Sequence, residues 1–118
     1  MTFLVKAEKL IEALDIFREE EKKRDEYNKA IFNATTEEKK NIKIGTPHPL
    51  LTALEISAEK HVLETLRKTK SSEIETSLLI LDFEHGKQLL ELLCYFLKNN
   101  YEIELVLKCA VFLLKYLL

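Results

Sequence analysis

The stretch IGTPHPLLTALEISAEKHVLETLRK, residues 44–68, decides how this chain folds, because it gathers most of the residues that interrupt helices. It holds both prolines of the 118-residue chain, Pro47 and Pro49, and one of its two glycines, Gly45. Gly45 is predicted to end one helix, and Pro47 favours extended backbone in the residue before it. Pro49 fits the first turn of a new helix, predicted over 50–55, because a helix start does not need the N–H that proline lacks. The stretch therefore predicts a turn between two helices.

Two polar side chains in this stretch predict where the helices around it begin. His48, between the prolines, is expected to help cap the helix that follows it rather than to bind a metal. Ser57 can cap a further helix, with Glu59 in its first turn. That helix carries apolar residues and ends in a basic tract: Val62, Leu63 and Leu66, then Arg67, Lys68 and Lys70.

The N-terminal part of the chain predicts one long helix. Its apolar residues recur every three or four positions, which is typical of one helix face. Nine consecutive charged residues follow, REEEKKRDE at 18–26, and the apolar positions then resume. Glu19 lies one turn before Lys23, the favourable order for an ion pair on a solvated helix. We predict a helix from about Ala7 to Phe32, about 40 Å long at 1.5 Å per residue, whose charged segment is exposed or, less favoured, a docking surface.

Boxes of the form S/T-x-x-E predict two further helix starts. TTEE at 35–38 is predicted to open a short helix that ends at Gly45, and SEIE is predicted to open a helix over 72–81. A helix is next predicted over 88–98, ended by two asparagines, and a last one over 105–118.

Length and composition agree with one folded domain. The 118 residues suffice for a single packed core, and 47% apolar with 32% charged residues is globular composition. Period-two alternation bounded by turn residues, the pattern of strands, is missing from the sequence. The chain is therefore predicted to be all-α: a single domain over 1–118 of about five to seven helices, in an irregular bundle or solenoid-like stack with a long charged first helix.

The last segment, EIELVLKCAVFLLKYLL at 102–118, has only two charged residues after position 104, Lys108 and Lys115. Its apolar run is shorter than the roughly 20 residues that a bilayer core requires, so we expect no membrane span. A helix that is apolar on nearly all sides is either central in a fold or part of a subunit interface, and hydropathy alone does not separate the two. The candidate interface residues are Leu105, Phe112, Leu113, Tyr116 and Leu117.

Charge limits the partners that the chain can attract. The formal net charge is −2, so no overall field draws it to nucleic acid or to an anionic membrane. An RNA contact would need a local patch, for which the candidates are Lys60, Arg67, Lys68 and Lys70. These charges also suit the negative end of their own helix, which is the preferred explanation. The N-terminus, MTFLVKAEKL, lacks the apolar run of a secretory signal, which predicts an intracellular protein.

Side chains able to carry chemistry are few and scattered. Cys94 and Cys109 lie among apolar residues, away from the histidines, and are predicted to be buried free thiols rather than metal ligands. His85, beside Glu84, has no partner nucleophile nearby and is interpreted as structural. The sequence lacks a phosphate-cradling glycine loop, an H-E-x-x-H motif and a nucleophile elbow. We therefore expect no catalytic site, metal, cofactor or small-molecule substrate.

Taken in order, these motifs resemble the C-terminal helical domain of the Utp-twelve (Dip-two) family, WD-repeat proteins of the UTP-B subcomplex of the small-subunit processome. The elements that carry the resemblance are the E-A-L of the first helix at 12–14, the P-H-P turn at 47–49, the serine-capped helix at 57–70, the S-E-I-E box at 72–75 and the leucine-rich helix pair at 89–117. Each is a structural signal, and their order and spacing over most of the chain are the specific feature. The family places this domain after WD-repeat propellers, and we expect none in this chain.

The resemblance implies a scaffold in ribosome biogenesis rather than an enzyme. Domains of this kind associate through their helices with the helical C-terminal domains of other UTP-B WD-repeat subunits, in the nucleolus, during pre-rRNA processing toward 18S rRNA. Self-association of the isolated domain and indirect or weak contact with pre-rRNA or snoRNA are further expectations. Two alternatives stay open: an RNA-binding helical module that uses the local basic patch, and a generic helical adaptor.

Overall fold

The structure is a computed structural model, and it describes residues 3–39, 41–43 and 45–117. Within these residues every regular element is a helix, which confirms the predicted all-α class. The seven helices are α1 (Phe3–Asn33), α2 (Thr36–Lys39), α3 (Pro49–Leu54), α4 (Ala58–Lys68), α5 (Ser71–Ile80), α6 (Phe83–Lys98) and α7 (Ile103–Leu117). None of the helices in this part of the chain is both long and apolar enough to span a membrane.

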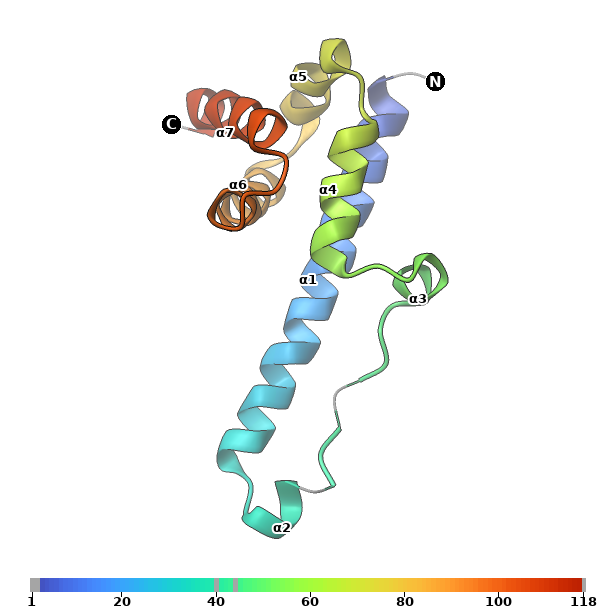
Figure 1. Cartoon of the computed structure of the whole chain (residues 1–118), viewed down its shortest axis with the longest axis vertical. Helices are drawn as coiled ribbons and strands as arrows, with labels where there is room; N and C mark the ends of the chain where they lie inside the picture. Colours follow the sequence, from blue (N-terminus) through green and yellow to red (C-terminus); the bar gives the residue numbers. More distant parts are fainter. Residues whose placement is uncertain (1–2, 40, 44, 118) are drawn as a thin grey trace.

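Helix α1 is the long axis of the molecule, and the other packed helices gather beside its N-terminal half (Figure 1). Helix α4 runs antiparallel along that half, and α5, α6 and α7 stack next to it, while α2 lies alone near the far end of α1. The molecule extends 54 × 30 × 26 Å, and its radius of gyration is 16.3 Å. A compact domain of this length would have a radius of gyration of about 13–14 Å. The difference reflects the projecting half of α1.

The core forms where five helices meet beside the N-terminal half of α1. Its largest fully buried side chains include Leu14 of α1, Leu66 of α4 and Phe96 of α6. The ring of Phe96 lies 5.8 Å from that of Tyr95 and 6.3 Å from that of Tyr101, distances typical of aromatic pairs. A smaller cluster seats α3 on α1: Ile16, Leu51 and Ala58.

The charge run determines where α1 leaves the core. From Arg18 onward the helix has no fully buried residue, and Phe32 near its end is 86% exposed. Lys23 pairs with Glu20 at 3.1 Å, not with the predicted Glu19. Such surface pairs contribute little to stability, so this half of α1 is a solvated arm that begins at the charge run, as predicted.

Three predicted helix bounds are wrong by several residues. Helix α1 begins at Phe3 rather than at about Ala7. Helix α2 ends at Lys39, well before Gly45, although its TTEE box forms as predicted, with the N–H of Glu38 donating to Thr35 Oγ1 at 3.3 Å. Helix α6 begins at Phe83 rather than Gln88. The start was not predicted because the sequence FEHGKQ, residues 83–88, lacks the regular apolar spacing of a helix. The side chain of Asp82 caps the helix at this point, as described below.

The predicted S-E-I-E cap is also wrong, because α5 begins at Ser71, one residue before that box. Its N-cap is Lys70, which makes no side-chain capping hydrogen bond. By contrast, Ser57 caps α4 as predicted, accepting from the N–H of Lys60 at 3.2 Å. The thiol prediction holds for Cys109, which is buried, and fails for Cys94, which is exposed on α6.

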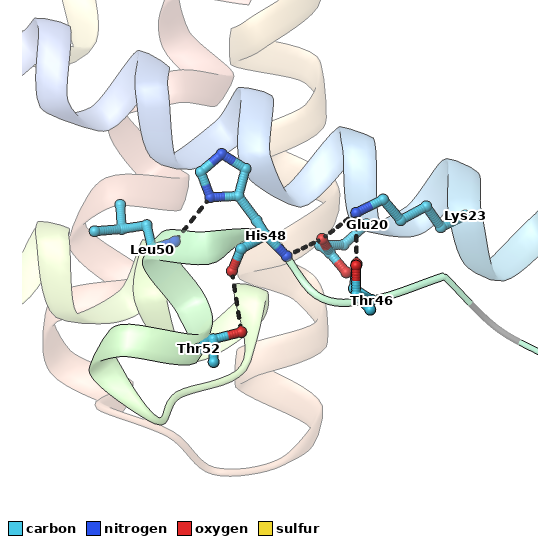
Figure 2. Close-up of polar contacts among 6 residues, drawn as sticks. All are labelled: Glu20, Lys23, Thr46, His48, Leu50 and Thr52. Carbon is cyan, nitrogen blue, oxygen red and sulfur yellow. Dashed lines mark hydrogen bonds and ion pairs between the residues drawn. The ribbon is translucent and has the colours of Figure 1, made fainter.

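The proline stretch forms the predicted turn, and His48 caps α3. Its Nδ1 accepts from the N–H of Leu50 at 3.1 Å, as Figure 2 shows. Pro49 lies in the first turn of the helix, as predicted. The helix ends at Glu55 in a left-handed conformation, φ 54°, with its N–H bonded back into the last turn. The short helix is therefore closed at both ends by local hydrogen bonds.

The same turn is tied to α1 through one carboxylate. Glu20 Oε1 accepts from the backbone N–H of His48 at 2.8 Å and from Lys23 Nζ at 3.1 Å (Figure 2). Lys23 Nζ also donates to the carbonyl of Thr46 at 2.9 Å. These contacts fix the direction in which the chain returns from the arm, so that α4 packs back along α1.

Candidate protein-interaction surface

Helix α7 has two apolar faces that differ in their surroundings. The inner face packs into the core through Val106, Cys109, Ala110 and Leu113, each at most 6% exposed. Burial raises the pKa of the Cys109 thiol to about 11, so this thiol stays protonated at neutral pH. The inner face therefore belongs to the hydrophobic core.

The outer face of α7 is also apolar, yet no described part of the chain covers it. It consists of Ile103, Leu107, Val111 and Leu114, which are 48%, 50%, 47% and 43% exposed. Their spacing of four, four and three residues places them in one row along the helix. Single exposed leucines are ordinary, whereas a continuous row of them is a candidate interaction surface.

Helix α6 extends this apolar row. Phe83 is 60% exposed, Cys94 is exposed, and Leu90 and Leu97 are half-buried, at spacings that put all four on one side of α6. The two helices pack against each other as a hairpin, joined by a turn in which Asn100 has a φ of 59°. Phe83 and Cys94 are thus exposed on α6, whereas Leu90 and Leu97 pack against the core cluster.

A glycine allows the two helices of the hairpin to approach closely. A Cβ atom at Gly86 would lie 3.3 Å from Leu117 Cδ2, closer than side chains usually pack. The first turn of α6 thus sits directly against the last turn of α7.

The polar contacts of α6 set the position of the hairpin on α1. Asp82 caps α6 by accepting from the N–H of His85 at 2.8 Å. The His85 ring bridges two carboxylates, Nδ1 to Asp82 at 2.8 Å and Nε2 to Asp15 of α1 at 2.7 Å. Gln88 Nε2 donates to the carbonyl of Leu14 at 2.9 Å. The structural role predicted for His85 is thus a clamp between α6 and α1.

The clamp shifts two pKa values. Burial lowers the pKa of His85, but hydrogen bonds and attraction from Asp15 and Asp82 outweigh it, so the net shift is upward. The backbone and side-chain hydrogen bonds from His85 lower the pKa of Asp82. The clamp is therefore strongest when His85 is protonated and both acids are ionised.

The predicted interface residues lie on different sides of α7. Leu113 is buried in the core at 3% exposed, and Leu105, Phe112 and Leu117 are half-buried against it. Tyr116 is 61% exposed and stacks on Phe112, with ring centroids 4.7 Å apart. Of the five, Tyr116 is the one that is largely exposed, and the predicted set contains no residue of the outer face. Helical spacing reveals the row, but not which of two apolar faces the other helices cover.

The candidate RNA-contact residues are exposed but interleaved with acids. Arg67 pairs with Glu64 at 2.7 Å, and Glu64 lies one turn from Lys60 on the same side of α4. Lys68 lines a groove of about 570 Å³ between α1, α3 and α4, which Glu64 also lines. Lys70 is exposed at the N-cap of α5. The four cations do not form an acid-free patch.

His61 lies in the same groove as a neutral side chain. Its Nδ1 is buried without a hydrogen-bond partner, and burial lowers its pKa, with Glu12 opposing the shift. No cluster of three or more potential metal ligands occurs in the described part of the chain.

Residues 58–116, which hold α4 to α7 and the whole hairpin, match the model of the Dip2/Utp12 family. The chain belongs to this family. The match covers half of the chain, and it confirms the family that the motif order predicted. The outer face described above therefore lies on the helices that define the Dip2/Utp12 family.

Two relatives of the chain are WD-repeat proteins. It is 38% identical to WD repeat-containing protein 3 of Homo sapiens and 36% identical to WD repeat-containing protein 3 of Mus musculus, each over 111 residues. These alignments cover 92% of this chain and 11% of each relative. The chain therefore spans about a tenth of the length of these relatives.

Proposed function

We propose that this chain is a protein-interaction and scaffold module of a ribosome-biogenesis factor. In this proposal it helps to hold UTP-B subunits together in the small-subunit processome, in the nucleolus, during pre-rRNA processing toward 18S rRNA. Membership of the Dip2/Utp12 family supports the ribosome-biogenesis setting. The role requires binding rather than catalysis.

The observation that carries the proposal is the outer face of α7. Four large apolar side chains, each about half exposed, remain in water along one row. Covering them would contribute on the order of 3–5 kcal/mol of hydrophobic free energy before the costs of association. A partner helix laid along the row would reach all four, because they follow one side of α7 from its first turn to its last.

The partners that fit this role are other WD-repeat subunits of UTP-B, bound through their own helical domains. The relatives of this chain are themselves named as WD-repeat proteins, which supports such a setting. A helical domain with an uncovered apolar row matches a second domain of the same kind, since each can bury the row of the other.

The observations do not favour direct RNA binding as a second function. Glu64 forms an ion pair with Arg67 and lies between the basic residues of α4. Binding to phosphates would weaken steeply as salt rises, whereas binding through an apolar face would not. Salt dependence of partner binding therefore separates the two functions.

The test is affinity purification of the tagged chain from its own cells, followed by mass spectrometry. Wild-type chain should recover WD-repeat subunits of UTP-B, and a Leu107→Glu/Val111→Glu variant should lose them. Leu54→Glu on α3 is the matched control, because Leu54 is 53% exposed and lies away from the hairpin. Recovery of the same subunits by the double variant, or recovery that ribonuclease abolishes, would contradict the proposed role.

A further inference from the structure

We infer that the outer face of α7 is self-complementary and pairs with α7 of a second copy of this chain in antiparallel orientation. This inference goes beyond the proposed function, because it concerns the purified chain alone and requires no ribosome-biogenesis partner.

The inference rests on one ridge of α7. Glu104, Leu107, Val111 and Lys115 follow one another at three, four and four residues, so they form a single row along the helix. All four are exposed, with Leu107 at 50% and Val111 at 47%. The ridge thus carries an acid at one end, two apolar residues in the middle and a base at the other end.

The order of these residues suits a two-fold axis. When two copies of α7 lie antiparallel and cross between Leu107 and Val111, Leu107 of each copy faces Val111 of the other. Glu104 and Lys115 are equally far from that crossing point, to within about one residue. Glu104 of each copy therefore meets Lys115 of the other, which gives two ion pairs around an apolar centre. A parallel pair would instead oppose like charges at both ends.

The described part of the chain leaves these two charges available. It contains no ion pair of Glu104 or of Lys115. Lys108 lies one turn after Glu104 on the same side of α7, and its Nζ donates to the carbonyl of Ser71, at the start of α5, at 3.5 Å. The two charged side chains that the antiparallel pairing needs, Glu104 and Lys115, are exposed, and neither forms an ion pair with another described residue.

The expected dimer is weak. A 15-residue helix is about 22 Å long, so one helix pair buries less than a standard protein interface. We expect a dissociation constant on the order of 10–100 µM, and therefore mixed monomer and dimer in this range.

Sedimentation equilibrium of the purified full chain over about 1–500 µM tests the pairing. Wild type should show a monomer–dimer equilibrium. Leu107→Glu should weaken it at least tenfold, since two charges would meet the apolar centre. Leu54→Glu should leave it unchanged, and circular dichroism should show wild-type helicity for both variants. A wild-type chain that stays monomeric throughout, or a Leu107→Glu chain that dimerises like wild type, overturns the inference.

Charge exchange tests the antiparallel register. Glu104→Lys and Lys115→Glu should each weaken the dimer by roughly tenfold, because each places like charges together twice. An equimolar mixture of the two variants should recover wild-type affinity. In the mixed dimer, the lysine at position 104 of one variant faces the glutamate at position 115 of the other, and the native Lys115 of the first faces the native Glu104 of the second. The double variant Glu104→Lys/Lys115→Glu should recover it as well. Single variants without effect, or a mixture without recovery, overturn this pairing even if a dimer forms.

The two tests separate this inference from the proposed function. If purified wild type is monomeric but recovers WD-repeat subunits from cells, the second-copy inference is wrong and the proposed function stands. If the dimer forms with the predicted charge dependence but no such subunits are recovered, the inference stands and the proposed function is wrong.

Discussion

The inner and outer faces of α7 have nearly the same chemistry and opposite surroundings. The inner face has Val106 and Leu113 in the core, and the outer face has Leu107 and Val111 about half in water. Because both faces are built from leucine, valine and similar residues, hydropathy does not distinguish the face that is buried in the core from the face that stays exposed. Only the placement of α5 and α6 does so.

The arm of α1 is a second exposed helix surface, and its composition differs from that of the outer face of α7. Its exposed residues are dominated by the charge run at 18–26. If exposure alone determined composition, the outer face of α7 would be charged as well. The outer face therefore differs from the solvated arm in exposing apolar side chains, which is the property that the proposed binding role uses.

The largest expected effect is the difference in stability between alanine variants of two adjacent leucines, one on each face of α7. Leu113→Ala should lower the free energy of unfolding by about 2–4 kcal/mol, because it leaves a cavity in the core. Leu114→Ala should change it by less than about 0.5 kcal/mol, because Leu114 is 43% exposed. Urea denaturation at a low concentration of chain measures both. Equal losses for the two variants would show that the faces do not differ.

A helix cap far from α7 sharpens the comparison. Ser57→Ala should cost about 1 kcal/mol of stability, because the N–H of Lys60 loses its acceptor at the start of α4. Association through α7 should stay as in wild type. The measurement pairs denaturant unfolding with sedimentation, and weaker association at full helicity would mean that folding and binding are not separable here.

The His85 clamp predicts a smaller, pH-dependent effect on folding alone. The folded-state pKa of His85 is raised, so its stabilising contribution is fully present below the unfolded pKa and is lost as pH rises through the folded pKa. The stability difference between wild type and His85→Gln should therefore shrink from about pH 5.5 to about pH 8. Thermal unfolding of both proteins measures this difference. The pKa of His61 is lowered rather than raised, but His61 is present in both proteins and so does not affect the comparison. A difference that grows with pH would contradict the clamp.

The smallest expected effect concerns an isolated apolar residue on the arm. Phe32 is 86% exposed, more than any residue of the outer face. Phe32→Ala should change the free energy of unfolding by less than about 0.5 kcal/mol and leave association unchanged. Denaturant unfolding and sedimentation check both. Loss of association in this variant would shift the binding surface from α7 to the arm.

Local signals predicted the local structure well. Pro49, His48 and Ser57 act within one turn of their own position, and each does what the sequence predicts. The same is true of the charge run, because nine charged residues cannot enter a core together. The start of α5 differs from the prediction, since the helix begins at Ser71 and its N-cap is Lys70 rather than Ser72.

Contacts between distant residues were not predictable from the sequence. His85 and Asp15 are 70 positions apart, and nothing in their local sequence links them. The outer face of α7 depends in the same way on which side α5 and α6 cover. For this reason the sequence predicted Leu113 as an interface residue and did not predict Leu107. Both lie on one apolar helix, but the core covers Leu113 and leaves Leu107 about half exposed.

The most direct test of the outer face is hydroxyl-radical footprinting of the chain, free and in the complex purified from its cells. Side-chain oxidation at Leu107, Val111 and Leu114 should fall in the complex, while oxidation at Leu54 should stay as in the free chain. That result is predicted if a partner covers the outer face. Equal oxidation of the three residues in both states would contradict it, and the row would then be exposed surface without a binding role.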